Sequence, residues 1–513
     1  MKKALTILTG ILIAFSSYSQ NSNTFSKVNY YFGDSTTNAS HIKSIVKIDS
    51  GYLIGVTGEY DSTYYDLFII KTDPNGNILD MYHKTDPNSH YMLNYGKSII
   101  IDQDSNIIVC GSEYIKQPLF RWIGYAIKLN PSLDTLWTTR ILYPDTLPGC
   151  TGNAPCMMFK AIHETPDGGY IIPGKYYYDC VADINSARTF LIKLDAGGNE
   201  EWRRMYMDKK YTYSIDVTND GGYVFPDFKS QWRITKTDSL GNDSWVTQPN
   251  DSVHMIASDL ALKDNYVIAV SPFRYNNTDN PYDMKYGLDI VKIDEATGQI
   301  IWNKQYRTFD SFHCVTLHQA MEVVLTDNDD IVIAGSVIDQ YINGQYYSNR
   351  GILFRLNSQG DSLWCRLYDV RRDQDMSQFN DVVITDDGGF LAAGFFKPYD
   401  HSYAVGGLLV KTDSMGMAPN TLTLNIQYYL EKQSKNIKVY PNTAENTITF
   451  DAGKIASFKE VLLTIYDSKG QKLSQLHLNS AVSKIDIKKY KSGVYFYRLQ
   501  SNGKEYTGKF MKV

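Results

Sequence analysis

The chain has 513 residues, of which 43% are hydrophobic and 21% charged, a balance typical of a folded globular protein and too apolar for a disordered one. Tyrosine is unusually frequent, with 40 copies against 21 Phe and 7 Trp, and together with the many Gly, Asn and Asp residues it indicates an all-β protein. Residues 20–436 hold 50 acidic and 36 basic side chains, and this acidic balance argues against nucleic acid as a partner.

The first residues have the pattern of a targeting segment. Two lysines precede an apolar run from Ala4 to Phe15, and small residues follow at Ser17 and Ser19. This arrangement predicts a cleaved signal peptide over residues 1–19, because a membrane-spanning helix needs about 18 or more apolar residues. No later stretch of the sequence is long and apolar enough to be a transmembrane segment. We therefore expect an extracellular protein or one held on the outer cell surface.

One sequence unit recurs seven times within residues 20–420. Each copy has a GY-type element such as GYLIGVT (51–57), followed by an IK-type element such as TFLIKLDAGGNEEW (189–202). The basic residue of the IK-type element recurs at intervals of 43 to 65 residues, at Lys71, Lys128, Lys193, Lys236, Lys292, Arg355 and Lys411. Units of this length with four short antiparallel strands are typical of propeller blades, so the sequence predicts a seven-bladed β-propeller.

The last unit lacks an outer strand of its own, because residues 417–419 turn to Met-Ala-Pro after its IK-type element. Residues 24–31 offer a spare strand near the N-terminus. Phe25 stands 26 residues before the GY-type element of the first unit, much as Trp364 stands 25 residues before that of the last. We therefore expect the N-terminal strand to complete the last blade and close the ring.

Five of the seven tryptophans fall at the start of the fourth strand of a unit. The phrase from Asp294 to Trp302 resembles the tryptophan-docking motif of quinoprotein-type propellers, in which the indole packs one blade on the next. The resemblance implies a structural, blade-docking role for Trp137, Trp202, Trp245, Trp302 and Trp364. Nothing in the sequence indicates a quinone site, and we expect no cofactor.

The connections between the second and third strands of the units carry most insertions, at 58–66, 113–124, 175–188, 272–287, 337–350 and 396–406. In a propeller these connections share one face, here called the long-loop face, and long loops on a rigid scaffold often carry function. The insertions are rich in tyrosine, whose flat ring and hydroxyl suit contact with a protein or a carbohydrate. With two nearby arginines, the predicted ligand-binding residues are Tyr64, Tyr65, Trp122, Tyr177, Tyr282, Tyr286, Tyr346, Tyr347, Tyr403, Arg371 and Arg372. The alternative is that these rings only pack the loops together.

Evidence for catalysis in the sequence is weak, and we assign no catalytic residue. The loop carboxylates that could serve as acid and base in polysaccharide cleavage are Asp279, Asp283, Asp373 and Asp375. Exposed loop carboxylates are mostly solvated, so whether the protein is an enzyme stays open, with a non-catalytic role favoured. His313, Cys314 and His318 match no metal-ligand spacing, and we predict no metal site.

The six cysteines are too few for a disulfide-stapled fold. Cys150 and Cys156 share one Gly/Pro-rich loop and could form a local disulfide, and Cys180 in a nearby loop is a third candidate for such a bond. Cys110 and Cys365 fall in predicted strands, where we expect them to be buried as small apolar residues.

Residues 437–513 form a separate module, joined to the propeller by a linker at 421–436. This module holds 13 basic residues against 6 acidic ones, opposite in sign to the rest of the chain. Its alternating apolar positions and Gly-centred turns predict six or seven strands in a small β-sandwich, of the immunoglobulin-like kind.

Three phrases of this module occur in a characteristic order, at 439–442 (VYPN), 463–471 (LTIYDSKGQ) and 492–499 (SGVYFYRL). Together they resemble the type A sorting domain of the bacterial type IX secretion system, although Thr443 stands where that family often has a second proline. The resemblance implies that the type IX secretion machinery is a partner, that the protein crosses the outer membrane, and that the source is a Bacteroidetes-type bacterium. The propeller repeats also resemble those of exported proteins from such bacteria.

The sequence thus favours a secreted or cell-surface propeller that recognises an extracellular glycan or protein through the long-loop face, without catalysis. One alternative is a polysaccharide hydrolase or lyase that uses the loop carboxylates. The other is a structural component of the cell surface with no discrete ligand.

Overall fold

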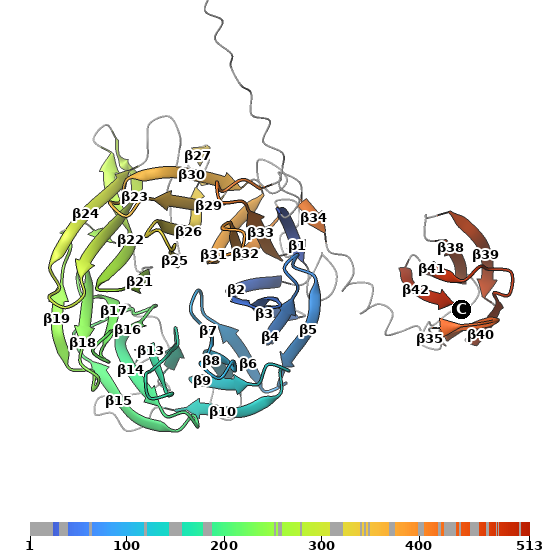
Figure 1. Ribbon diagram of the computed structural model, residues 1–513, viewed down its shortest axis with the longest axis horizontal. Coiled ribbons are helices and arrows are strands. Elements are labelled where there is room, and N and C mark those ends of the chain that lie inside the picture. Colours follow the sequence, from blue (N-terminus) through green and yellow to red (C-terminus); the bar gives the residue numbers. More distant parts are fainter. Residues whose placement is uncertain are drawn as a thin grey trace, which may run out of the picture.

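All elements of the fold are β-strands (Figure 1). The computed structural model describes residues 24–29, 39–60, 64–116, 121–142, 156–177, 187–250, 253–254, 259–277, 280–307, 322–338, 341–342, 345–346, 349–368, 375–398, 405–418, 422–424, 438–440, 443–451, 461–467, 471–478, 480, 482–501 and 504–513. Within these ranges, no helix has the length and apolar character needed to cross a membrane.

Seven consecutive sheets, here called blades 1 to 7 and antiparallel except for one parallel strand pair in blade 7, are arranged in a ring (Figure 1). Blade 1 consists of β2 (Ala39–Ile48), β3 (Gly51–Tyr60), β4 (Tyr64–Thr72) and β5 (Ile78–Lys84). Blade 2 consists of β6 (Ser89–Leu93), β7 (Ile99–Ile101), β8 (Ile107–Ile115), β9 (Arg121–Leu129) and β10 (Thr135–Ile141). Blade 3 consists of β11 (Cys156–Phe159), β12 (His163–Glu164), β13 (Tyr170–Tyr177), β14 (Ala187–Leu194) and β15 (Glu200–Tyr206).

The second half of the ring follows the same pattern. Blade 4 consists of β16 (Asp216–Val217), β17 (Tyr223–Phe228), β18 (Trp232–Thr237) and β19 (Asp243–Thr247). Blade 5 consists of β20 (Val253–His254), β21 (Asp259–Lys263), β22 (Tyr266–Asn277), β23 (Asn280–Asp294) and β24 (Ile300–Arg307). Blade 6 consists of β25 (Glu322–Leu325), β26 (Ile331–Ile338), β29 (Asn349–Leu356) and β30 (Ser362–Tyr368), with the separate hairpin β27 (Tyr341–Ile342) and β28 (Gln345–Tyr346) between β26 and β29.

Blade 7 is assembled from both ends of the propeller sequence. It consists of β31 (Met376–Ile384), β32 (Phe390–Lys397) and β33 (Gly406–Thr412), completed by β1 (Phe25–Asn29) and by β34 (Leu422–Leu424). Strand β1 runs antiparallel to β33 and places Phe25 opposite Lys411. This pairing confirms that the N-terminal strand closes the last blade.

The basic residue of the IK-type element stabilises its own blade. Asp-containing turns join the first and second strands, and the amine of Lys193 lies 2.9 Å from Asp167 in such a turn. Lys236 pairs in the same way with Asp220 at 2.7 Å. These contacts explain why the repeat keeps a cation at this position without any need for a ligand.

Tryptophans of the fourth strands pack on the turn between the third and fourth strands of the next blade. A Cβ atom added to Gly198 of blade 3 would lie 2.8 Å from the indole of Trp137 in blade 2, so only glycine leaves room for this ring. The same contact joins Trp245 to Gly298, Trp302 to Gly360 and Trp364 to Gly416, whereas an added Cβ at Gly241 would lie 3.5 Å from Trp202. The indole nitrogen of Trp245 also donates a hydrogen bond to the Glu295 carbonyl oxygen at 3.0 Å.

The apolar core lies between neighbouring blades. One buried cluster joins blades 6 and 7 through residues such as Leu353, Phe379 and Phe390, and equivalent clusters join the other blades. Cys110 is buried as predicted. The prediction for Cys365 was wrong, because it lies on the outermost strand of blade 6, where Trp364 takes the inward position and Cys365 points outward.

The C-terminal module contains two sheets. One consists of β35 (Lys438–Tyr440), β37 (Thr447–Asp451) and β40 (Val482–Asp486). The other consists of β36 (Thr443–Ala444), β38 (Val461–Tyr466), β39 (Lys472–Leu478), β41 (Gly493–Ser501) and β42 (Lys504–Lys512). Both sheets contribute to one core, which includes Phe450, Leu463 and Tyr497, as expected of a small β-sandwich.

Candidate functional site

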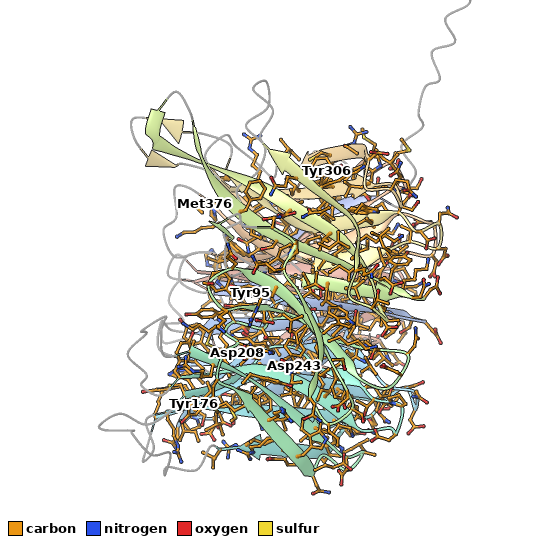
Figure 2. All side chains as sticks on the ribbon, turned by 90° about the vertical axis from the view of Figure 1, so that its left-hand side faces the viewer. Tyr95, Tyr176, Asp208, Asp243, Tyr306 and Met376 are labelled. Carbon is orange, nitrogen blue, oxygen red and sulfur yellow. The ribbon has the colours of Figure 1, made fainter. Side chains whose placement is uncertain are left out.

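The hairpins between the second and third strands of the blades open on one face, because consecutive strands alternate in direction. The longest hairpin is β22–β23, which projects beyond the rest of the ring (Figure 2). Blade 4 has the shortest hairpin, because β17 and β18 have only 6 residues each and are joined by residues 229–231. The strand bounds therefore place the sequence insertions on the long-loop face.

The residues predicted for ligand binding differ in how far the structure describes them. Side chains are described for Tyr65, Trp122 and Tyr177. Only the backbone is described for four others, which belong to β4, β23 and β28: Tyr64, Tyr282, Tyr286 and Tyr346. Outside the described residues lie Tyr347, Tyr403, Arg371 and Arg372.

Tyr65 and Trp122 belong to a chain of aromatic rings that links blades 1 and 2. The imidazole of His90 lies between Tyr65 and Tyr114, with ring centroids 5.6 and 5.9 Å away, and Tyr114 lies 5.2 Å from Trp122. The backbone amide of Tyr65 donates to Nδ1 of His90 at 3.1 Å. All four side chains are partly buried, so contacts with one another account for much of their surface.

A second group of side chains lies closer to the ring axis, at the inner edge of the long-loop face. Lys175 is two residues before the end of β13, and its amine donates a hydrogen bond to the hydroxyl of Tyr213. The same amine lies 4.0 Å from the ring centroid of Tyr213 and 4.6 Å from that of Tyr211. Burial raises the pKa of Tyr177, which ends β13.

Two further lysines adjoin this group from other blades. The amine of Lys160, which follows β11, donates to Oδ1 of Asn94 at 2.6 Å and lies 5.4 Å from the ring centroid of Tyr213. The amine of Lys43, on β2, lies 4.1 Å from the ring centroid of Tyr95. We call this set the axial lysine site, and its members are Lys43, Asn94, Tyr95, Lys160, Lys175, Tyr211 and Tyr213.

Burial determines the electrostatics of the axial lysine site. It lowers the pKa of Lys160 to about 8, and the nearby Lys43 acts in the same direction. It also lowers the pKa of Lys175 well below its usual value, with a contribution from Lys160. The pKa values of Lys160 and Lys175 are thus lowered because each amine is removed from water and lies close to another cation.

A fourth lysine at the axis has acidic surroundings instead. Residues 94–98 interrupt the inner strand of blade 2, between β6 and β7, and carry Lys97 across the ring. Its amine lies 3.2 Å from Asp216 of blade 4 and donates to the Leu260 carbonyl oxygen of blade 5 at 2.7 Å. Burial alone would lower the pKa of Lys97, but the carboxylates of Asp216, Asp259 and Glu322 raise it above its usual value.

These carboxylates also join neighbouring blades. Oδ2 of Asp259 accepts a hydrogen bond from the backbone amide of Val323 in blade 6, at 2.7 Å. In blade 7, Oδ2 of Asp381 accepts one from the amide of Ile45 in blade 1, also at 2.7 Å. We call Lys97, Asp216, Asp259, Glu322 and Asp381 the axial acid layer. Its hydrogen bonds to the backbone indicate a structural role.

The described residues give little support to catalysis by the loop carboxylates. Asp375 is buried, the side chain of Asp283 is not described, and Asp279 and Asp373 lie outside the described residues. His313, Cys314 and His318 also lie outside them. In the part of the chain that the structure describes, no group of His, Cys, Asp and Glu side chains could hold a metal ion. Cys156 is disulfide-bonded, while Cys150 and Cys180 are outside the described residues.

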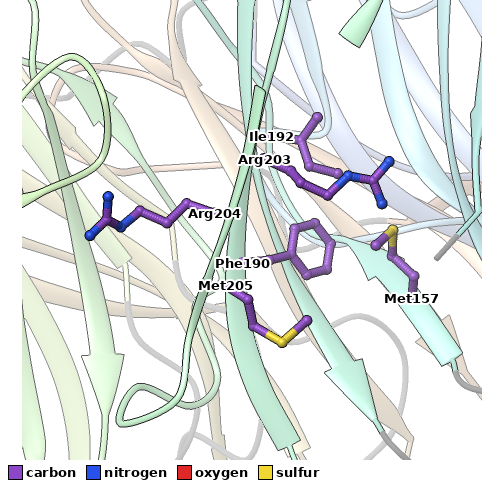
Figure 3. Close-up of a pocket in the computed structure, with 6 residues that line it drawn as sticks. All are labelled: Met157, Phe190, Ile192, Arg203, Arg204 and Met205. Carbon is purple, nitrogen blue, oxygen red and sulfur yellow. The ribbon is translucent and has the colours of Figure 1, made fainter. Parts of the chain in front are cut away.

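A small pocket lies at the outer side of blade 3, lined by Met157, Phe190, Ile192, Arg203, Arg204 and Met205 (Figure 3). Its two arginines point to opposite sides of β15. Arg203 is paired with Glu200, and Arg204 donates to Oδ1 of Asn242 at 2.6 Å. Since both guanidinium groups already have partners, this pocket is a weaker candidate than the axial lysine site.

No pattern in the sequence predicted the axial lysine site. One available signal was the presence of lysines at 43, 160 and 175 next to apolar residues of inner and second strands, where charge is unusual. Another was the segment Asn94–Ser98, which breaks the repeat pattern of an inner strand with polar residues and a glycine. Neither signal reveals that these residues meet, because they belong to different blades.

Comparison with solved structures finds propeller-like proteins of low sequence identity. A protein of unknown function from Dyadobacter fermentans is 10% identical, with a TM-score of 0.41, over 75% of this chain and 98% of that chain. The polysaccharide lyase Uly1 is 9% identical, with a TM-score of 0.40, over 75% and 92%. The WD40 domain of Neurospora crassa Pan2 is 12% identical, with a TM-score of 0.34, over 63% and 91%. A search of curated proteins finds no match.

The C-terminal module is similar to a defined family. Residues 438–513 match the secretion system C-terminal sorting domain, in agreement with the resemblance drawn from the three sequence phrases. A sorting domain of this kind implies the type IX secretion machinery as a partner and indicates a secreted or cell-surface location. The chain is therefore an all-β propeller protein that carries a type IX secretion sorting domain.

Proposed function

We propose that the protein binds an extracellular glycan at the inner edge of the long-loop face, without cleaving it. The observation that carries this proposal is the contact of Tyr211 and Tyr213 with the amine of Lys175 near the ring axis, with Tyr177 close to Tyr213. Tyrosine rings pack against the apolar faces of sugars, and their hydroxyls and a nearby amine can bond to sugar oxygens. Tyr177 and Tyr213 are partly exposed, whereas Tyr211 is buried, so a ligand would contact the first two rings.

The position of the group favours a slender ligand over a folded protein. Tyr170 and Tyr266 occupy the same place in blades 3 and 5, each as the first residue of the second strand, so Lys175 corresponds to Ser271. Strand β22 continues six residues beyond Ser271, to Asn277. The tyrosines therefore lie deeper than the tip of this hairpin, where an oligosaccharide chain would reach them more readily than a flat protein surface.

Export would bring the protein to such a ligand. We propose that residues 1–19 are a cleaved signal peptide, although they lie outside the described residues. The sorting domain would then direct the protein across the outer membrane of a Bacteroidetes-type bacterium, for release or for display on the cell surface.

A glycan array probed with the purified full-length protein tests the proposed function. We expect reproducible binding to one class of polysaccharide, no release of new sugar ends, and at least about a tenfold loss of affinity in Tyr213→Ala. Tyr440→Ala, an exposed tyrosine of the C-terminal module, is the control and should bind like the wild type. Silence on every glycan would contradict the proposal, as would equal binding by the Tyr213→Ala protein.

A further inference from the structure

The axial lysine site contains three amines that are almost entirely removed from water. The exposed fractions of Lys43, Lys160 and Lys175 are 6%, 7% and 6%. They come from β2, from the residue after β11, and from β13, and they converge from blades 1 and 3 toward the segment Asn94–Tyr95 of blade 2. Long-chain amines are rarely buried to this degree unless they have an anionic partner.

The partners of these amines are neutral. Lys160 donates to the amide oxygen of Asn94, Lys175 donates to the hydroxyl of Tyr213, and Lys43 faces the ring of Tyr95. Among the described residues, no carboxylate forms an ion pair with any of the three. The nearest titratable groups that perturb Lys160 are Cys110 and Lys43, and the one that perturbs Lys175 is Lys160.

Lys97 shows that the same ring does supply acids to a buried amine. Its amine lies at the axis, 3.2 Å from Asp216, and the carboxylates of Asp216, Asp259 and Glu322 stabilise its positive charge. The four carboxylates of the axial acid layer are contributed by blades 4 to 7, whereas the axial lysine site is contributed by blades 1 to 3 and the segment that follows β15. Among the described residues, the three amines of the axial lysine site therefore lack the carboxylate partners that Lys97 has.

From this arrangement we infer that the glycan bound at the axial lysine site is acidic, and that its carboxylate or sulfate groups are held by Lys43, Lys160 and Lys175. The inference rests on the proposed function and specifies the chemistry of its ligand. Ammonium groups donate strong, charge-assisted hydrogen bonds to such oxygens, and burial strengthens them further. The partly exposed rings of Tyr95 and Tyr213 supply the surface against which the sugar rings pack, and the buried Tyr211 supports the amine of Lys175.

Matched pairs of polymers separate acidity from sugar recognition. Comparing dextran sulfate with dextran tests whether sulfate groups are recognised. Comparing polygalacturonate with its fully methyl-esterified form tests whether carboxylate groups are recognised. We measure binding to the purified full-length protein by titration calorimetry at two salt concentrations. At least one acidic polymer should bind about tenfold or more tightly than its neutral partner, and its affinity should fall as salt rises.

Variants show whether the axial lysine site is responsible. Lys175→Met and Lys160→Met should each weaken binding of the acidic polymer about tenfold or more, while preserving the fold, because methionine fills similar volume without charge. Lys229→Met is the matched control, since Lys229 lies on the same face in the β17–β18 connection and is exposed. A melting temperature for each variant shows that a loss of binding is not a loss of folding.

Each outcome has one meaning. Equal binding of the acidic and neutral polymers, with Tyr213→Ala still defective, would overturn the acidic-ligand inference and leave glycan recognition standing. Equal effects of Lys229→Met and Lys175→Met would also overturn it. If a single-stranded DNA oligomer bound as tightly as the acidic polymers, the site would recognise polyanions in general, and the inference of an acidic glycan would be overturned. No binding to any of these polymers or to the glycan array would overturn both proposals.

Discussion

Phe25 packs directly on Gly76, so the strand that completes blade 7 also covers a turn of blade 1. A Cβ atom added to Gly76 would lie 3.2 Å from the Phe25 ring. Phe25 faces Lys411 across β33, just as Trp137, Trp202 and Trp364 face the basic residue of their own blades. The phenyl ring thus takes the place of the docking tryptophan at the junction between the last blade and the first.

Removing this ring should weaken the closure of the propeller. We expect Phe25→Ala to lower the free energy of unfolding by about 2 to 3 kcal/mol, below the range for a fully buried aromatic ring because Phe25 is partly exposed. Leu79→Ala, on the outer strand of blade 1 and 56% exposed, is the control and should cost far less. Equal losses in the two variants, measured by denaturant unfolding, would contradict a special role for Phe25.

The contact between Trp137 and Gly198 predicts a difference between two glycine substitutions. Gly198 and Gly168 have similar positive φ angles of 82° and 78°, so alanine is strained at both. An added Cβ has nothing within 4 Å at Gly168 but meets the indole at Gly198. We expect Gly198→Ala to lower the free energy of unfolding by about 1 to 3 kcal/mol more than Gly168→Ala, as measured by denaturant unfolding. Similar losses would show that blade docking tolerates the extra atom.

Removing Lys97 should leave the axial acid layer without its cation. We expect Lys97→Met to lower the free energy of unfolding at pH 7 by about 3 to 5 kcal/mol, because buried carboxylates lose their partner. Burial already raises the pKa of Glu322 well above its usual value and that of Asp381 to about 7. The loss should therefore shrink at pH 5, where more of these acids are protonated.

Denaturant unfolding at pH 7 and pH 5 measures this effect. Lys47→Met is its control, since Lys47 pairs with the exposed Asp386 at the surface. A loss for Lys97→Met that is the same at both pH values would argue against a charge effect in the acid layer.

Lys160 should make stability depend on alkaline pH. Its pKa is near 8 in the folded chain and near 10.5 in the unfolded chain, so the unfolded state binds more protons between these values. Stability therefore rises as pH increases from 8 to 10.5 and gains no further contribution from this group outside that window. We expect the wild type to show a rise, of about 3 kcal/mol, that Lys160→Met lacks.

Unfolding curves of the wild type and Lys160→Met, measured at several pH values from 7 to 10.5 without added polysaccharide, give this difference directly. A constant difference across the window would mean that the Lys160 amine titrates at its ordinary value in the folded protein.

The sorting domain predicts a clear result in cells that have a type IX secretion system. A chain without residues 438–513 should stay inside the outer membrane, whereas the full chain should reach the medium or the cell surface. Fractionation followed by immunoblotting checks this, with the Lys229→Met protein as a full-length control. Export of the shortened chain at normal levels would show that residues 438–513 are dispensable for sorting.

Much of the architecture can be predicted from the sequence because its causes are local and repeated. Each blade needs the same alternation of apolar residues, the same Asp- and Gly-containing turns and the same basic residue, so the pattern is visible at every copy. The spacing of Phe25 predicted the closing strand by comparison with Trp364. Leu133 of blade 2 is an exception, because it takes the turn position that Gly198 takes in blade 3. The preceding blade, blade 1, has Asp80 where other blades have the docking tryptophan, so no indole packs on this turn and a side chain fits there.

The candidate site depends on tertiary structure for a physical reason. Ring closure brings inner strands from distant parts of the chain to one axis, so that Lys97 meets Leu260 across 163 positions of sequence. The partner of a lysine at this axis depends on which blades face each other. Lys97 meets a carboxylate, whereas Lys175 meets a tyrosine. The sequence by itself determined the strands, the blades and the sorting domain, whereas only the folded ring decided which buried amines lie beside carboxylates and which lie beside neutral groups.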